Sequence, residues 1–452
     1  MRTRFTWIGA MLVLVAIGFL MACSTKYKPS SNGLIVVPAQ GSAVMQTFSL
    51  NLGNGHVSQI NNTSGPPIPG LPGAVILDPT GAFAYVVVNQ NATLPGSATG
   101  VVSFKIGSDG KLAAGTMSPT LNSTGPTTAN ITCTTSTNVQ DTFAVSVQPA
   151  PVVPHALAID SAGKYLFVAD VVTSGQTLPY LNPCTNVTET ATVPVPGAVT
   201  VFSVSSGSLT EIAGSPFALP NEAGGTAGSA SALAVTPTAF PIEFAACSGH
   251  AAPTTENLYV TDSANNIVLN YTVASDGTLA AVPTATTPGV STGTTPSGVA
   301  VDPCGQFVYV ANSVSNTVSA FTICTAVSQN CLQGDYSLQP VLSSPFSVGD
   351  TPGPIAVDPF AKYVYVVDTG SSQLSGFRIS ASDGSLTAIT GTPIATNSGA
   401  NSIAIRSDGS WIFVANLNAA NVSQYAITQA TGGLTPQTPF TSLNYPTGVA
   451  VK

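Results

Sequence analysis

A seven-residue phrase that recurs along the chain constrains the fold more than any other feature. It consists of a small residue, two variable residues, an aliphatic residue, a variable residue, an aliphatic residue and, in most copies, Asp. Internal self-similarity of this kind is typical of repeat architectures, in which each unit buries its apolar surface against its neighbours. The seven copies are Pro72–Asp78, Pro154–Asp160, Ala230–Val235, Pro296–Asp302, Pro352–Asp358, Ala400–Arg406 and Pro446–Lys452.

Two further phrases follow the first one in nearly every copy, and a short fourth strand comes after a turn such as Asp109-Gly110 or Asp383-Gly384. Asp-Gly between alternating runs is a strong signal for a β-hairpin. The second phrase is rich in aromatics and ends in Asn or Asp in six copies, which are Phe83–Asn89, Tyr165–Asp170, Leu258–Asp262, Phe307–Asn312, Tyr363–Asp368 and Trp411–Asn416; the seventh copy is Leu34–Pro38. The third, alternating phrase occurs at Ala43–Leu50, Val101–Ile106, Ala198–Val204, Ile267–Val273, Thr317–Ile323, Gln373–Ile379 and Asn421–Ile427.

Four short antiparallel strands per unit, repeated seven times, predict an all-β, seven-bladed β-propeller. The chain opens on a second strand at Leu34–Pro38 and closes on a first strand at Tyr445–Lys452, so each end supplies what the other lacks. We expect the C-terminal strand to pair with the N-terminal strand and close the ring, which leaves no long unpaired edge. The propeller then occupies residues 33–452.

Composition excludes several classes of function. Only 7% of the residues are charged, against roughly 25% in an ordinary soluble domain. There are 11 Lys and Arg against 19 Asp and Glu, so no basic cluster is available to neutralise a nucleic-acid backbone, and no nucleic-acid partner is expected. No nucleotide-binding loop, serine-hydrolase elbow or HExxH motif is present. No cofactor is therefore expected.

The N-terminal segment resembles a bacterial lipoprotein signal peptide. Two arginines precede the apolar run Ile8–Met21, which is too short to span a bilayer comfortably. The sequence Leu20–Cys23 resembles a lipobox, which implies cleavage before Cys23 and acylation of its thiol; an ordinary secretory signal with an incidental Cys is the alternative. Residues 1–22 are then the signal peptide and residues 23–32 a flexible tether. We expect an extracytoplasmic protein anchored to the cell envelope, at the outer membrane.

The repeated phrases resemble those of YVTN-type and lactonase-type seven-bladed propellers. Phe307–Asn312 and Trp411–Asn416 carry the resemblance most clearly, and it covers essentially the whole processed chain. Lactonase propellers carry Pro-His at the head of one inner strand and Asp soon after the next strand; Pro154-His155 and Asp170 look like that pair. The resemblance implies that His155 would act as a general base or position a water, with Asp170 as its orienting partner.

The next blade departs from the lactonase pattern. The family carries Pro-Arg-His on its inner strand and Asn-Glu after the following strand, where this chain has Ser231–Leu233 and Thr261–Ser263. The Arg that would hold an anionic substrate and the Glu that would serve as acid or base are both missing. Asp262 is one carbon shorter than Glu. Phosphogluconate chemistry is not expected, because the mouth lacks the Lys and Arg that a phosphate needs.

Six Cys remain after Cys23, an even number that suits a disulfide framework outside the cytoplasm. In each blade, the first-to-second and third-to-fourth connections lie on one face, here called the lower face, and the other connections lie on the upper face. Sorting the Cys residues by face predicts the pairs Cys133–Cys184, Cys247–Cys304 and Cys324–Cys331. Free buried thiols are the alternative, and no metal site is expected because no His or Cys pair has ligand spacing.

Second strands end in Asn or Asp at the upper face. Two interpretations stay open: Asx-turns that cap the strands, or a polar mouth that coordinates a cation or a sugar. Tyr180, in an upper-face insertion, is a candidate for stacking on a sugar. The insertions at about 115–153 and 171–197 flank the blade that carries His155. The strand-ending residues are Asn89, Asp170, Asp262, Asn312, Asp368 and Asn416.

The sequence therefore leaves two functions open. The first is a monomeric, membrane-tethered propeller that binds a protein, glycan or small molecule at its upper mouth or acts as an interaction scaffold. The second is a lactonase-like hydrolase that acts on an unknown lactone, with His155 as base. A purely structural role for His155 is the alternative to both.

Overall fold

The computed structural model describes residues 32–60, 65–90, 98–118, 127–134, 140–147, 153–171, 173–181, 188–195, 197–220, 228–237, 247, 253, 255–282, 289–325, 331, 335–442 and 444–452. In 127–134, 140–147, 173–181 and 188–195 it describes the backbone alone. Among the described residues, no helix is long and apolar enough to cross a membrane. The predicted signal peptide, residues 1–22, and Cys23 lie outside the described residues.

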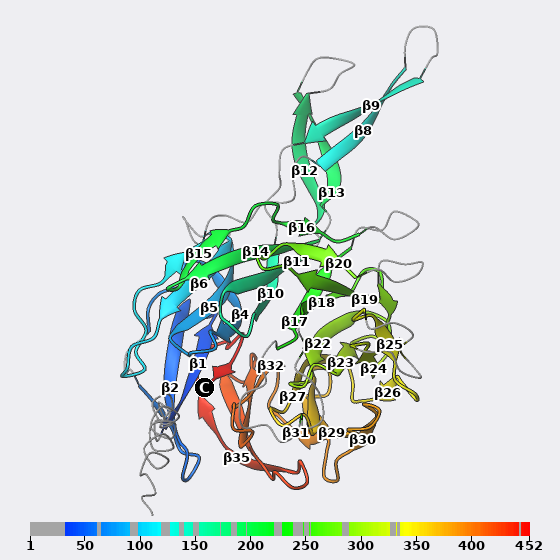
Figure 1. The fold of residues 1–452 in the computed structure, drawn as a ribbon. Coiled ribbons are helices and arrows are strands. Elements are labelled where there is room, and N and C mark those ends of the chain that lie inside the picture. Colours follow the sequence, from blue (N-terminus) through cyan, green and yellow to red (C-terminus); the bar gives the residue numbers. More distant parts are fainter. Residues whose placement is uncertain are drawn as a thin grey trace, which may run out of the picture.

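Seven antiparallel sheets form the ring predicted from the repeats (Figure 1). We call the strands of each blade A to D, from the axis outward. Blade 1 consists of β36 (Ala450–Val451), β1 (Asn32–Ala39), β2 (Val44–Asn51) and β3 (Val57–Gln59). Blade 2 consists of β4 (Leu71–Leu77), β5 (Phe83–Asn89), β6 (Gly100–Lys105) and β7 (Thr116–Met117). Blade 3 consists of β10 (Val153–Ile159), β11 (Tyr165–Val171), β14 (Ala198–Ser205) and β15 (Ser208–Glu211), with β16 (Phe217–Ala218).

The remaining four blades follow the same order of strands. Blades 4 and 5 are β17 (Ala230–Val235), β18 (Glu256–Asp262), β19 (Ile267–Val273), β20 (Leu279–Ala281), with β21 (Val290–Ser291); and β22 (Pro296–Val301), β23 (Phe307–Asn312), β24 (Thr317–Ile323), β25 (Leu338–Pro340), with β26 (Phe346–Ser347). Blades 6 and 7 are β27 (Pro352–Val357), β28 (Tyr363–Asp368), β29 (Gln373–Ile379), β30 (Leu386–Ala388), with β31 (Ile394–Ala395); and β32 (Ala400–Ile405), β33 (Trp411–Asn416), β34 (Asn421–Ile427), β35 (Leu434–Thr441).

The outermost strand D is split in blades 3 to 6, where two short segments pair with the same strand C. In three of these blades a proline stands directly before the second segment: Pro216 before β16, Pro345 before β26 and Pro393 before β31. Proline has no backbone N–H to give to a ladder, so the strand stops and restarts around it. The sequence predicted one short fourth strand and missed this division.

Ring closure occurs between the two ends of the described chain, as predicted. Ile35 and Val36 of β1 pair with Val451 and Ala450 of β36, and an isolated bridge joins Ala39 to Pro446. Figure 1 shows the C-terminus inside the ring beside β1. The N-terminal and C-terminal strands therefore belong to one blade, in which β1 is paired on both sides, with β2 and with β36.

The core lies between adjacent blades rather than inside one sheet. Alternate side chains of β1 show this: Ile35 packs with Phe413 of blade 7, whereas Val36 packs with Val86 of blade 2. A strand B is thus buried on both faces, as in β23, where all six residues are buried. This explains why the second phrase is a nearly continuous apolar run instead of an alternating one.

The Asp that ends the first phrase caps the A–B turn on the lower face. Asp302, which is 1% exposed, accepts hydrogen bonds from the backbone N–H groups of Gln306 and Phe307, both at 2.6 Å. Asp78, Asp160 and Asp358 cap their turns in the same way. The recurring Asp is therefore a structural residue, because a buried turn needs acceptors for its backbone donors.

Two β-hairpins project from the ring at blade 3, next to each other (Figure 1). One consists of β8 (Thr127–Thr134) and β9 (Gln140–Val147), in the connection from blade 2 to blade 3. The other consists of β12 (Thr173–Leu181) and β13 (Thr188–Val195), between strands B and C of blade 3. Strands of the two hairpins contact each other. The sequence placed insertions here and predicted no strands in them.

Two of the three predicted disulfides are present: Cys247–Cys304 and Cys324–Cys331. The first joins the A–B connections of blades 4 and 5 on the lower face, and the second closes the C–D loop of blade 5. The third predicted pair, Cys133–Cys184, lies outside the residues whose side chains are described. The two observed bridges confirm the strand directions from which the pairs were predicted.

Candidate functional site at the upper ends of the inner strands

The pairing between strands A and B is interrupted by a β-bulge at the upper end of most blades. In blade 3 the register shifts between Pro154 and Ala156, which leaves His155 as the bulged residue. A bulge turns a side chain out of the regular alternation of the strand. The bulged residues at the equivalent register shifts of five other blades are Gly73 and Ala74, Ser231, Ser297, Gly353 and Pro354, and Asn401.

In four blades, the polar side chain at this position donates a hydrogen bond to a backbone carbonyl of the next blade. Ser231 Oγ donates to the Pro296 carbonyl at 2.7 Å, and Ser297 Oγ donates to the Pro352 carbonyl at 2.8 Å. The other two bonds run from Asn401 Nδ2 to the Pro446 carbonyl, at 3.3 Å, and from Thr447 Oγ1 to the Gly73 carbonyl, at 3.2 Å. These side chains link neighbouring blades.

His155 occupies the same position and does not form such a link. Within the described part of the chain, no hydrogen bond involves its side chain, which is exposed to solvent. Enough protein nevertheless surrounds the imidazole that desolvation lowers its pKa below the usual value for His. The ring is therefore neutral near pH 7 and offers one nitrogen as an acceptor and one as a donor.

Asp170, the predicted partner of His155, points into the blade. Its side chain is fully buried, and Oδ2 accepts a hydrogen bond from Thr200 Oγ1 of β14 at 2.6 Å. Oδ1 has no hydrogen-bond partner among the described atoms. Burial raises the pKa of Asp170 to about 7, and the nearby Glu211 adds to this rise. Asp170 lies opposite Pro154 in the register, but the described residues show no hydrogen bond between it and His155.

The other strand-ending Asn and Asp side chains are also directed away from solvent. Asn312 donates to Ser319 Oγ of strand C at 3.0 Å, and Asp368 accepts from Ser375 Oγ at 2.6 Å. Asp262 accepts the backbone N–H of Ser229 at 2.8 Å. Four of these residues, Asp262, Asn312, Asp368 and Asn416, are fully buried. Only Asn89 is partly exposed, and its amide donates to the Pro154 carbonyl at 3.2 Å.

This geometry favours the strand-capping interpretation for the predicted ring of Asn and Asp, because their polar atoms serve bonds within and between blades. Burial raises the pKa of Asp368 to about 6. Tyr180 lies on β12, outside the residues whose side chains are described. Among the described residues, no group of three His, Cys, Asp or Glu is placed to hold a metal ion.

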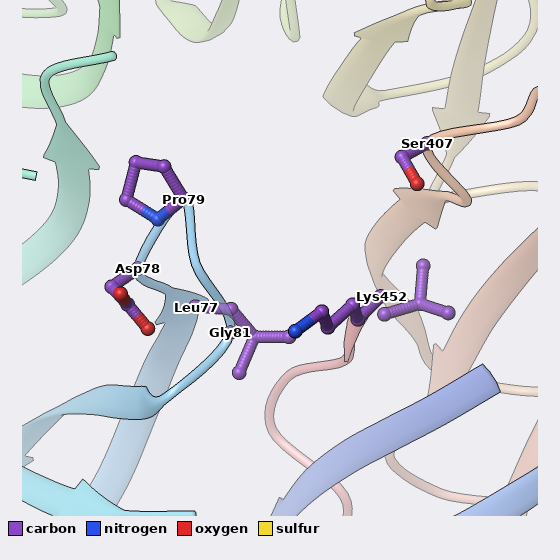
Figure 2. Close-up of a pocket in the computed structure, with 7 residues that line it drawn as sticks. Leu77, Asp78, Pro79, Gly81, Ser407 and Lys452 are labelled. Atoms are coloured by element: carbon purple, nitrogen blue, oxygen red, sulfur yellow. The ribbon is translucent and has the colours of Figure 1, made fainter. Parts of the chain in front are cut away.

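Two features that the sequence reasoning missed are Tyr445 and a lower-face pocket. Tyr445 is 51% exposed at the upper start of the last inner strand, and it is the one aromatic residue that directly precedes a first phrase. The pocket has a volume of about 350 Å3 and lies where the ring closes, lined by residues that include Asp78, Ser407 and Lys452. Figure 2 shows the Lys452 side chain extending toward the turn that contains Pro79 and Gly81.

The charged groups of the lower-face pocket are engaged in structural contacts. Lys452 Nζ donates to the Thr80 carbonyl, and the Asp78 carboxylate accepts the backbone N–H of Phe83 at 2.6 Å. The Lys452 carbonyl accepts a hydrogen bond from Arg406 Nε at 3.3 Å. This pocket is therefore part of the closing blade, and the upper ends of the inner strands remain the better candidate site.

The sequence matches the family described as lactonase, 7-bladed beta-propeller, over residues 197–330 and 250–451. Together these segments cover more than half of the chain. The protein therefore belongs to the family of seven-bladed lactonase propellers. No curated protein matches the sequence significantly.

Solved structures share the fold at low sequence identity. A putative 6-phosphogluconolactonase from Bacteroides fragilis has a TM-score of 0.60 and 16% identity, covering 94% of this chain and 99% of its own. A periplasmic gluconolactonase from Pseudomonas aeruginosa has a TM-score of 0.62 and 16% identity, covering 93% of this chain and 99% of its own. A protein from Lactobacillus plantarum has a TM-score of 0.60 and 14% identity, covering 93% and 99%. At these identities the likeness establishes the fold alone.

Proposed function

We propose that this lactonase-family propeller binds a ligand at its upper face and works outside the cytoplasm, tethered to the membrane through Cys23. The observation that carries the proposal is the position of His155. The equivalent Ser231, Ser297, Asn401 and Thr447 are used to link blades, whereas His155 is exposed and free of such a link within the described residues. A polar side chain released from the structural role of its counterparts is available for recognition.

The two hairpins, β8–β9 and β12–β13, also favour the upper face as the binding surface. Both flank blade 3: β9 precedes β10, the strand that carries His155, and β12 follows β11, which contains Asp170. Insertions on a rigid repeat scaffold commonly carry binding residues, because the scaffold fixes their position. The proposed surface therefore comprises His155, the two hairpins and the exposed Tyr445 at the upper rim.

The disulfides and the direction of β1 support the proposed location. Disulfides persist in oxidising compartments outside the cytoplasm, and two are present; one of the solved relatives is a periplasmic enzyme. β1 begins at the lower end of its blade, since Asn32 pairs with Asn51 beside the C–D turn. A tether over residues 23–32 spans at most roughly 30 Å and would hold the lower face toward the membrane, with the hairpins pointing away from it.

Ligand binding is tested with the detergent-extracted, processed protein and a panel of glycans and small molecules. The readout is the NMR signal of the His155 ring, assigned with His155→Gln. A ligand of the upper face shifts this signal, and we expect His155→Ala to weaken its binding by about tenfold, the loss of one good hydrogen bond. His56→Ala in an exposed lower-face turn is the matched control. Ligands that bind both variants with unchanged affinity would refute the proposed site.

Membrane attachment is tested separately with Cys23→Ser. We expect the wild-type chain to fractionate with the membrane and to incorporate a labelled fatty acid, and the variant to do neither, because the acceptor thiol is gone. A wild-type chain that is soluble after cell lysis contradicts the tether and leaves the ligand site untouched.

A second candidate function is lactone hydrolysis, which family membership and the neutral imidazole of His155 favour. A neutral imidazole is the form that accepts a proton from an attacking water. Two observations weigh against hydrolysis. Asp170 is hydrogen-bonded to Thr200 and not to His155. Ser231 lies where lactonase propellers carry the Arg and His of the Pro-Arg-His pattern. A panel of lactones assayed with wild type and His155→Ala decides the matter. Equal rates for the two proteins remove His155 from any catalytic role.

A further inference from the structure

The positive charges of the propeller lie on one side of the ring. Seven of the 11 Lys and Arg follow residue 32, and all seven are in A–B turns, in C–D turns or at strand ends next to those turns, which is the lower face. Lys164, for example, reaches the Ser275 carbonyl in the C–D turn of the next blade. The seven residues are Lys105, Lys111, Lys164, Lys362, Arg378, Arg406 and Lys452.

Segments outside the described residues do not change this partition. Between residues 33 and 452 those segments contain no Lys and no Arg in the sequence. Lys26 and Lys28 precede β1, which begins at the lower face. The upper face therefore has no permanent cation, wherever its loops lie. Its one described His, His155, is kept neutral near pH 7 by desolvation.

At the upper strand ends, the buried side chains of the described residues leave oxygen atoms rather than N–H groups without a partner. Asp350 is exposed there, in the connection that leads into β27. The amide nitrogens of Asn89, Asn312 and Asn401 already donate to other groups. Buried side-chain oxygens without a hydrogen-bond partner among the described atoms gather at these strand ends: Asn89 Oδ1, Asp170 Oδ1, Asn312 Oδ1, Asp368 Oδ1 and Asn401 Oδ1. Unpaired acceptors of this kind attract donors, usually water.

We propose that the upper face repels anions and takes a ligand that donates hydrogen bonds and carries no phosphate or carboxylate, such as a hydroxyl- or ammonium-bearing molecule. The inference rests on the proposed function, because it names the ligand class of that site. Recognition of a carboxylate or phosphate needs Arg, Lys or oriented N–H donors, and here the cations are on the opposite face. The exposed carboxylate of Asp350 adds a negative potential that an anion must overcome.

The potential at His155 can be measured without knowing the ligand. Three matched nitroxides are added to the processed protein: neutral 4-hydroxy-TEMPO, cationic 4-amino-TEMPO and anionic 4-carboxy-TEMPO. Each broadens the ring signal of His155 in proportion to its local concentration. At low salt we expect the cationic probe to broaden this signal at least about twofold more than the anionic probe, and the ratio to fall toward one as salt screens the field.

Added charges provide the controls. Ser231→Lys places a cation at the equivalent position of the next blade and should lower the ratio of cationic to anionic broadening. Because Ser231 also links two blades, a second variant, Thr294→Lys, places the cation at an exposed upper-face site instead. Ser382→Lys, in an exposed lower-face turn, should leave the ratio unchanged. A wild-type ratio of one or below overturns the inference. Failure of the proposed function is a distinct result: the ratio holds, but no ligand of the panel shifts the His155 signal.

Discussion

The Asp that caps each A–B turn offers a direct test of why the first phrase ends in that residue. Asp358 is 1% exposed. Its Oδ1 accepts the backbone N–H groups of Lys362 and Tyr363, both at 2.6 Å, and its Oδ2 accepts that of Phe360 at 3.1 Å. Asp358→Ala removes all three acceptors. Hydrogen bonds to a charged group contribute about 1.5–3 kcal/mol each, but burial of the carboxylate opposes them, as its raised pKa shows.

The net loss expected for Asp358→Ala is therefore about 2–4 kcal/mol in the free energy of unfolding, less than the sum of three bonds. Asp358→Asn keeps one oxygen for Lys362 and Tyr363 and sheds the desolvated charge, so we expect it to cost about 1 kcal/mol. Asp383→Ala, in an exposed turn, is the control for loss of a carboxylate. Urea unfolding followed by the fluorescence of Trp411 measures each value. An Asn variant as unstable as the Ala variant would contradict the hydrogen-bond argument.

Three further outcomes follow from buried groups. Tyr365→Phe removes a buried hydroxyl that bonds the next blade at 2.8 Å and should cost about 1 kcal/mol in urea unfolding, whereas Tyr445→Phe, on an exposed ring, should cost nothing measurable. Replacing Cys247 and Cys304 by Ser opens a loop with a sequence separation of 57 and should cost about 4 kcal/mol in urea unfolding on the chain-entropy model, more than opening the shorter loop between Cys324 and Cys331. Burial raises the pKa of Asp170 from 3.8 in the unfolded chain to about 7 in the folded protein. Its contribution to stability is therefore fully present in acid and is lost as the pH rises from about 4 to about 7. Asp170→Asn should flatten the free energy of unfolding over this range, and an unchanged slope would contradict the argument.

Much of the fold could be predicted from the sequence because each repeat carries its own strand signals. Phe307–Asn312 and Tyr363–Asp368 coincide with β23 and β28, since a strand B buried on both faces leaves a continuous apolar run. The disulfide Cys247–Cys304 followed from strand direction alone. The hairpin β8–β9 was missed, because its two strands match none of the repeated phrases that mark the ring strands.

The candidate site could be predicted only in part. His155 was singled out by resemblance, and aligning the second residue of each first phrase adds the stronger reason, since Ser231 and Ser297 at that position link blades. Asp170 was expected to face the mouth with it. A strand-ending Asp has two directions available, and the choice here is made by Thr200 of the neighbouring strand, a contact that sequence spacing does not encode.

The pairing of β1 with β36 has a consequence for how the protein matures. The first strand of the ring to be synthesised must wait for the last eight residues of the chain before its free side is covered. Until then, a long apolar ladder on β1 is open to any other extended polypeptide. A chain cut short near its C-terminus would leave this side of β1 unpaired and open to pairing with another copy of the same chain.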